Sequence, residues 1–155
     1  MESCYEKLVE RLRNRQVTLC LAESCTGGLL SSEITKMPGV SDVYMGSFVT
    51  YSNRLKKDVL KVPAHLLSTL GAVSRPVALH MALGAKTLTN TTWAVSITGI
   101  AGPTGGTDKK PVGTVCFAIV GPGFEWTIQE SFSGSRIQVQ QSSAEFAARS
   151  LLEFI

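Results

Sequence analysis

The chain has 155 residues, of which 44% are hydrophobic and 17% are charged. This is the length of one ordinary domain, and an apolar fraction of this size excludes an intrinsically disordered chain. Fifteen lysines and arginines against twelve aspartates and glutamates give a net charge of +3, an excess too small to indicate a nucleic-acid-binding protein.

No segment has the composition of an export signal or a membrane span. The amino terminus is charged from Glu2 onward, and the longest apolar run, residues 115–120, is far shorter than the roughly 20 residues that a span needs. The four cysteines form no Cys-x-x-Cys pair and no zinc-like cluster with histidine. We therefore expect a cytoplasmic protein with reduced thiols, with no membrane or nucleic-acid partner.

Helices and apolar strands alternate along the first half of the chain. The hydrophobic periodicity and the turn residues predict a helix over 2–15, a strand over 17–22, a helix ending at Met37, a strand over 43–51, and two short helices within 52–70. Strands that alternate with helices are typical of an α/β fold with parallel pairing.

The second half begins with a helix and ends with another. Ser74 is the expected N-cap of a helix through Thr89, followed by a strand over 93–97 and a glycine-rich loop to Pro111. Strands over 112–120 and 124–132, joined at Gly121-Pro122-Gly123, predict an antiparallel hairpin. The apolar faces of the two helices are expected to be formed by Val77, Met81, Ala85 and Leu88, and by Ile137, Ala144, Ala148, Leu151 and Ile155.

These elements predict a three-layer α/β/α sandwich with a mixed, mostly parallel sheet and a late antiparallel hairpin. Because no linker, repeat or low-complexity segment interrupts the chain, we expect one domain over residues 1–155.

Ser24 is the first candidate for chemistry, because it lies at the turn from a predicted strand to a predicted helix and precedes Gly27 and Gly28. Ligands of α/β folds bind beyond the carboxyl ends of the strands, and a serine there could attack a carbonyl while nearby N–H groups hold the oxyanion. The alternative is that Ser24 or Thr26 merely caps the following helix. Cys25 could be a rival nucleophile, but no histidine nearby would activate it.

Lys56 is a candidate general base. If Asn53 caps the following helix, Lys56 occupies the third helical position, where the helix dipole disfavours a cation by roughly 0.3–1 kcal/mol. Lowering a lysine pKa from about 10.4 to about 7.5 requires roughly 4 kcal/mol, so burial or a second cation such as Arg54 or Lys57 would have to supply the rest. Tyr51 could position the amine or relay a proton. The alternative is a solvated lysine on a surface helix.

The loop over residues 96–111 is unusually long and rich in glycine, so its backbone N–H groups could cradle a phosphate or a carboxylate. It matches neither Gly-x-x-x-x-Gly-Lys-Ser/Thr nor Gly-x-Gly-x-x-Gly, which gives a nucleotide hydrolase little support. Arg136, beside a helix N-terminus, suggests an anion between the two. The alternatives are a mobile surface loop and an exposed arginine.

Five segments, taken in order, are distinctive together. They are Ala22-Glu23-Ser24-Cys25-Thr26-Gly27-Gly28, Phe48-Val49-Thr50-Tyr51-Ser52-Asn53-x-x-Lys56, Gly71-Ala72-Val73-Ser74, the loop from Gly99-Ile100-Ala101-Gly102-Pro103 to Lys110-Pro111-Val112-Gly113-Thr114-Val115, and Phe132-Ser133-Gly134-x-Arg136. In this order they resemble the CinA carboxy-terminal domain family, the family of the bacterial nicotinamide-nucleotide amidase. The resemblance runs from about Tyr5 to the end of the chain.

The resemblance implies the three-layer fold and hydrolysis of the carboxamide of nicotinamide mononucleotide, which yields nicotinic acid mononucleotide and ammonia in pyridine nucleotide salvage. It also implies a site without a metal or other cofactor. Carried over by position, Ser24 corresponds to the nucleophile and Lys56 to the general base, with Tyr51 beside them. The residues expected to contact the substrate are Thr26, Gly27, Thr98, Gly99, Gly102, Gly105, Gly106 and Arg136.

Other interpretations stay open at this point. The domain could be a non-catalytic module that binds a pyridine nucleotide or another phosphate ligand, a partner-binding domain, or an amidase for another small carboxamide. Some family members carry an additional amino-terminal domain, for which 155 residues leave no room. A homodimer would suit a compact α/β enzyme, although no segment marks an interface.

Overall fold

The computed structural model covers residues 1–155 and contains six α-helices, a short 3-10 helix and five strands. The helices are α1 (Cys4–Arg15), α2 (Leu29–Thr35), η1 (Val40–Asp42), α3 (Asn53–Asp58), α4 (Ala64–Leu70), α5 (Arg75–Thr89) and α6 (Arg136–Phe154). The strands are β1 (Leu19–Glu23), β2 (Tyr44–Val49), β3 (Trp93–Gly99), β4 (Thr114–Gly121) and β5 (Phe124–Ser131). None of the helices combines the length and the apolar composition needed to cross a membrane.

The five strands form one sheet in the order β2-β1-β3-β4-β5. β1 pairs in parallel with both β2 and β3, whereas β4 pairs antiparallel with β3 and with β5. Four of the five strands therefore run in the same direction, which confirms the predicted mixed, mostly parallel sheet. The late hairpin is also confirmed, because Gly121 pairs with Phe124 across the two-residue turn.

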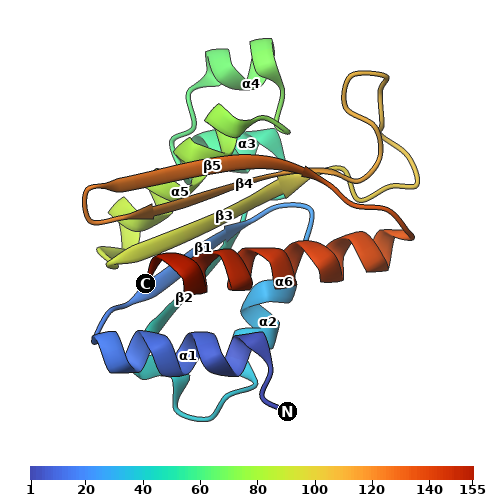
Figure 1. Ribbon diagram of the computed structural model, residues 1–155. Helices are drawn as coiled ribbons and strands as arrows, with labels where there is room; N and C mark the ends of the chain where they lie inside the picture. Colours follow the sequence, from blue (N-terminus) through green and yellow to red (C-terminus); the bar gives the residue numbers. More distant parts are fainter.

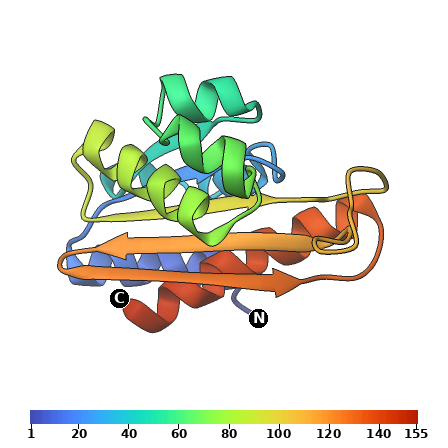
Figure 2. The same cartoon turned by 90° about the horizontal axis from the view of Figure 1, so that it is seen from above.

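Helices cover both faces of the sheet, as predicted for a three-layer sandwich. Figure 1 shows α1, α2 and α6 on one face and α3, α4 and α5 on the other, and Figure 2 shows the same layers from above. The strands β1 and β4, on either side of the central β3, are buried along their whole length, which requires cover on both sides.

The two faces of the sheet carry side chains of different size, and this sets how each helix layer packs. Leu21, Val95 and Phe117 belong to the core shared with α1, α2 and α6. On the opposite face the strands present small side chains to α5, among them Cys20, Ala22, Ala94, Cys116 and Ala118. The buried face of α5 is itself largely alanine. Small side chains on both surfaces let the helix lie close to the sheet.

Two details of the predicted helix faces are wrong. Leu88 is exposed, because the buried stretch of α5 ends at Ala85 and no later residue of the helix is fully buried. Ile137 is 64% exposed, because it lies two residues, or about 200° around the helix, from the buried Val139. The predicted cap of α5 is confirmed, since the Ser74 side chain accepts a hydrogen bond from the Val77 N–H.

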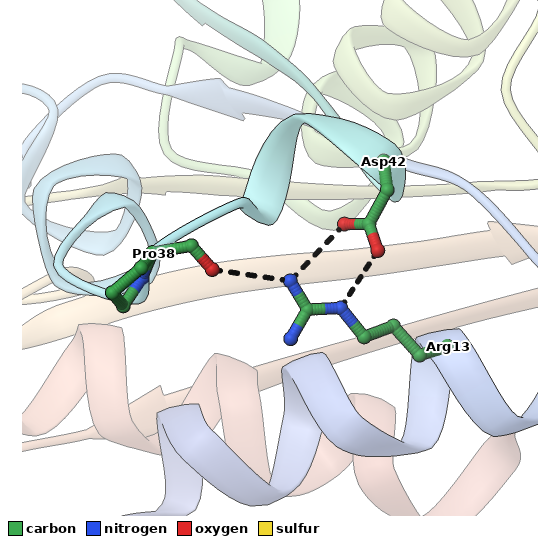
Figure 3. A network of polar contacts seen from close by, with 3 residues as sticks. All are labelled: Arg13, Pro38 and Asp42. Atoms are coloured by element: carbon green, nitrogen blue, oxygen red, sulfur yellow. Dashed lines mark hydrogen bonds and ion pairs between the residues drawn. The ribbon is translucent and has the colours of Figure 1, made fainter.

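A bidentate ion pair fastens the segment after α2 to α1 (Figure 3). The Arg13 guanidinium donates to both carboxylate oxygens of Asp42, at 2.7 and 3.3 Å, and to the Pro38 carbonyl at 3.3 Å. The paired Arg13 guanidinium holds the pKa of the Asp42 carboxyl below its ordinary value. This contact lies on the α1 side of the molecule and does not reach the site described below.

Gly84 provides a test of the close packing around α5. A Cβ at this position would collide with the backbone carbonyl of Leu60, which cannot move as a flexible side chain could. We expect Gly84→Ala to lower the free energy of unfolding by about 1–3 kcal/mol, although alanine is the better helix former. Urea denaturation measures this change, with the exposed Leu88→Ala on the same helix as the control. A Gly84→Ala protein as stable as the original would contradict the close contact between α5 and the Leu60 backbone.

Candidate active site

The parallel strands β1, β2 and β3 end at the same edge of the sheet, and the residues that follow them surround a cavity of about 310 Å³. Glu23 at the end of β1 lies beside Val49 at the end of β2 and Ile97 near the end of β3. The cavity is lined by Ser24, Cys25, Tyr51, Asn53, Lys56, Ala72, Val73, Thr98, Gly99, Ile100, Ala101, Gly102, Thr104, Gly105 and Arg136. No aspartate or glutamate is among them.

Ser24 occupies a tight turn between β1 and α2. Its N–H donates to the Ile97 carbonyl at 2.9 Å, which extends the pairing with β3 by one residue, and its carbonyl accepts from the Gly27 N–H at 3.0 Å. Gly27 and Gly28 both have positive φ angles, +58° and +99°, so the turn needs glycine at both positions. The Ser24 side chain is only 7% exposed and lines the cavity.

The Glu23 side chain stabilises this turn, a role that the sequence analysis did not predict. Its buried carboxylate accepts hydrogen bonds from the Thr26 hydroxyl (2.8 Å), the Leu30 N–H (3.0 Å), the Ser31 N–H (3.2 Å) and the Ser47 hydroxyl (3.0 Å). The first N–H groups of α2 are thus bound by a carboxylate from β1. The alternative that Ser24 or Thr26 caps this helix is wrong, because its N-cap is Gly28, without a side-chain bond.

Lys56 reaches the cavity from α3, and its amine lies 2.8 Å from the Ser24 hydroxyl oxygen. The side chain is 1% exposed, so the alternative of a solvated surface lysine is wrong. The expected cap at Asn53 is also wrong. The Ser52 hydroxyl accepts from the Leu55 N–H, which makes Ser52 the N-cap and moves Lys56 one position further from the helix end.

Burial, and not a second cation, lowers the pKa of Lys56 to about 8, whereas Cys25 acts in the opposite direction. Three oxygens surround Nζ: Ser24 Oγ, the Thr50 carbonyl at 2.8 Å and the Tyr51 carbonyl at 3.4 Å. In the neutral amine the two N–H bonds can serve the two carbonyls. The lone pair then faces the Ser24 hydroxyl, which is the arrangement that a general base requires.

Arg136 and Tyr51 meet at the rim of the cavity. The guanidinium donates from Nη2 to the Tyr51 hydroxyl at 2.9 Å and from Nη1 to the Gly102 carbonyl at 2.7 Å. Both acceptors are neutral, and Arg136 takes part in none of the four ion pairs of the protein. Its positive charge is therefore available to an anion in the cavity.

The loop after β3 is anchored at several points near its two ends. Ile100 exchanges hydrogen bonds with the far end of the loop, donating to the Thr114 carbonyl and accepting from the Gly113 N–H at 2.8 Å. The Lys110 amine donates to the Leu70 carbonyl at 2.6 Å, and Arg136 holds Gly102. Figures 1 and 2 show the loop projecting at the end of the molecule where α6 begins.

The backbone offers two N–H groups to an oxyanion. The Ser24 N–H is already bound to Ile97, but the Cys25 N–H bonds to no other residue. Because the Ile100 N–H points to β4, the N–H of Gly99 points the other way, toward the Ser24 turn. Gly99 also has to be glycine, since a Cβ there would lie 2.7 Å from the Val115 side chain.

Eight of the eleven predicted site residues line the same cavity: Ser24, Tyr51, Lys56, Thr98, Gly99, Gly102, Gly105 and Arg136. The other three do not. Thr26 is bound to Glu23, Gly27 lines a separate hollow beside Ile137, and Gly106 packs against the Val112 backbone. The Thr98 hydroxyl is also engaged, because it donates to the Ala72 carbonyl at 3.0 Å.

The lining residues that received no predicted role are mostly small or apolar, such as Ala72, Val73 and Ile100, and such side chains give no chemical signal in a sequence. Burial raises the pKa of the Cys25 thiol to about 12, which keeps this rival nucleophile protonated. No three histidine, cysteine, aspartate or glutamate side chains lie close enough together to hold a metal ion.

Comparisons with known proteins agree on one family. A family model described as the CinA C-terminal domain matches residues 1–155. A CinA-like protein of Prochlorococcus marinus subsp. pastoris is 47% identical over 146 residues, covering 92% of this chain and 34% of that protein. A CinA-like protein of Syntrophobacter fumaroxidans is 49% identical over 147 residues, covering 94% and 35%. The chain thus spans about a third of the length of these curated relatives.

Solved structures give the same result. The competence/damage-inducible protein of Agrobacterium tumefaciens matches with a TM-score of 0.91 and 35% identity, over 99% of this chain and 96% of that one. A competence-damaged protein (CinA) superfamily member from Escherichia coli matches with a TM-score of 0.94 and 36% identity, over 98% and 88%.

The Glu23 carboxylate provides a test of how the serine turn is held. Glu23→Ala leaves two backbone N–H groups and two hydroxyls without their acceptor, and a buried unsatisfied group costs about 1–3 kcal/mol. We expect the free energy of unfolding to fall by at least about 2 kcal/mol in urea denaturation. Glu145→Ala, which removes an exposed partner of Arg149, is the control and should cost less than about 1 kcal/mol. Equal losses in the two variants would contradict this role of Glu23.

Proposed function

The chain belongs to the CinA C-terminal domain family, and from its site we propose that it hydrolyses the carboxamide of nicotinamide mononucleotide through a serine ester. The products are nicotinic acid mononucleotide and ammonia. One observation carries the proposal: a buried lysine amine, with no carboxylate beside it, lies 2.8 Å from a serine hydroxyl at the ends of three parallel strands.

In the first half of the reaction, neutral Lys56 accepts the proton of the Ser24 hydroxyl, and Oγ attacks the carboxamide carbon. The N–H groups of Cys25 and Gly99 are the candidate donors to the resulting oxyanion. As the C–N bond breaks, protonated Lys56 returns its proton to the departing nitrogen, which leaves as ammonia. The acyl group remains on Ser24 as an ester.

In the second half, Lys56 is again neutral and accepts a proton from water, whose oxygen attacks the ester carbon. The Ser24 oxygen leaves and takes this proton back from the lysine, and the product carries a carboxyl group. The same amine therefore serves both half-reactions, and neither needs a catalytic histidine.

The preference for a nucleotide over a simple amide is supported by the rim of the cavity. Arg136 has two neutral partners and no ion pair, so a phosphate there would supply the missing negative charge. Gly102 and Gly105, with positive φ angles of +84° and +92°, belong to the backbone beside it. A substrate panel read by ammonia release distinguishes this substrate from another small carboxamide, and from a module that binds without turnover.

Ser24→Ala tests the ester route. We expect ammonia release from nicotinamide mononucleotide to fall by at least about a thousandfold, because no other group can form the acyl intermediate. Binding of the nucleotide, measured by calorimetry, should persist, since Arg136 and the loop remain. Ser32→Ala, on the exposed side of α2, is the matched control. A Ser24→Ala enzyme that keeps most of its rate would refute the ester.

The pH profile tests Lys56. Its neutral form is the active one, so kcat/KM should rise with pH through an apparent pKa of about 8 and level off above it. Lys56→Met should lower kcat by about 10²–10⁴-fold with a much smaller change in affinity. Lys57→Met alters the exposed neighbour on the same helix and should leave both the rate and the profile unchanged. An activity that falls as pH rises toward 8 would contradict a neutral lysine base.

A further inference from the structure

A continuous line of contacts connects the rim of the cavity to the nucleophile. Arg136 Nη2 donates to the Tyr51 hydroxyl at 2.9 Å, and the Tyr51 backbone carbonyl lies 3.4 Å from the Lys56 amine, which is 2.8 Å from Ser24 Oγ. Tyr51 is thus in contact with the rim through its side chain and with the general base through its backbone.

The backbone around Tyr51 also determines where Lys56 lies. Only Thr50 and Tyr51 separate the end of β2 from Ser52, the N-cap of α3. The carbonyls of both residues accept from the Lys56 amine, and α3 itself carries Lys56. Any shift of this two-residue connection therefore changes two of the three contacts of the amine.

Little else holds the Tyr51 ring. The side chain is 60% exposed, and the contact with Arg136 is its only hydrogen bond. Arg136 has five N–H donors, of which the two contacts described here use two. An anion bound by this guanidinium would therefore fix its orientation, and with it the position of the Tyr51 hydroxyl.

We propose that an anionic group bound at Arg136 positions Lys56 through Tyr51, so that the substrate phosphate accelerates turnover as well as providing affinity. Tyr51 is then a positioning residue for the general base. This inference rests on the proposed amidase function. In physical terms, the binding energy of the phosphate, which does not react, stabilises the transition state more than the bound substrate and so raises kcat.

The first experiment divides the substrate into two pieces. Nicotinamide riboside lacks the phosphate, and inorganic phosphite can supply a separate dianion. We expect the kcat for the riboside to be at least about tenfold below that for the nucleotide, and to rise at least about fivefold, with saturation, as phosphite is added. Equal kcat values that differ only in KM would overturn the inference. So would phosphite that only inhibits nucleotide turnover and never accelerates the riboside.

The second experiment is a double-mutant cycle on the ratio of the two kcat values, nucleotide over riboside. Arg136→Ala removes the anion contact, whereas Tyr51→Phe removes only the hydroxyl and keeps the ring and the backbone carbonyl. If Arg136 acts through Tyr51, both single variants and the double variant should lower the ratio to the same value. All three variants should also lose the activation by phosphite. Independent, multiplicative losses would overturn the coupling.

Two controls separate this inference from folding and from the proposed function. Arg54→Ala removes an exposed arginine of α3 that pairs with Asp58 and does not line the cavity, and it should leave the ratio unchanged. Thermal unfolding of each variant reports whether the fold is intact. If the original protein releases no ammonia from the nucleotide, the proposed function itself fails. If it turns over both substrates with equal kcat, only the coupling fails.

Discussion

The site depends on the burial of one lysine amine against one serine hydroxyl. Removing an ammonium from water is costly, and a buried lysine responds by giving up its proton more readily. The protein surrounds the Lys56 amine with two backbone carbonyls and Ser24, all of them uncharged, so no neighbouring carboxylate offsets the cost of burying the cation. A carboxylate in place of any of these oxygens would raise the lysine pKa and leave less of the amine neutral.

The sheet topology is what allows residues 32 positions apart to meet. Ser24 follows β1, the Thr50–Tyr51 connection follows β2, and Gly99 ends β3; these strands are parallel neighbours, so their carboxyl ends coincide. The antiparallel strands β4 and β5 have a different role. They extend the sheet that α5 and α6 cover, and α6 brings Arg136 to the same edge as the parallel strand ends.

The order of the elements follows from local patterns, which also point to Ser24 and Lys56 as candidates; the choice between their chemical and structural roles rests on the family resemblance. A local pattern can be interpreted without knowing what packs against it. Examples are the strand-forming runs, Ser74 before a helix, and the small residues after a strand. Other features depend on contacts that are distant in sequence. Glu23 acquires its role only when Ser47 and the first turn of α2 surround it, and no spacing in the chain announces that.

The same distinction explains the errors at helix ends and faces. Ser52 and Asn53 are both good N-caps, and choosing between them decides whether Lys56 is the third or the fourth residue of the helix. Only the bond from the Leu55 N–H to the Ser52 hydroxyl settles that choice. Leu88 and Ile137 are apolar, but whether an apolar side chain is covered depends on the face of the helix that it occupies and on what packs against that part of the helix, which composition alone does not determine.

The absence of acidic side chains from the cavity affects Lys56 and Arg136 in different ways. Near Lys56 it means that no neighbouring negative charge raises the pKa of the amine from about 8, and near Arg136 it leaves the guanidinium without an ionic partner. The carboxylate closest in sequence, Glu23, is adjacent to Ser24, yet it points into the N-terminus of α2, where N–H groups and hydroxyls satisfy it. One turn of the chain thus directs a hydroxyl into the cavity and a negative charge away from it. The glycines at 27 and 28 permit that turn, so the electrostatics of the site depend on a backbone conformation.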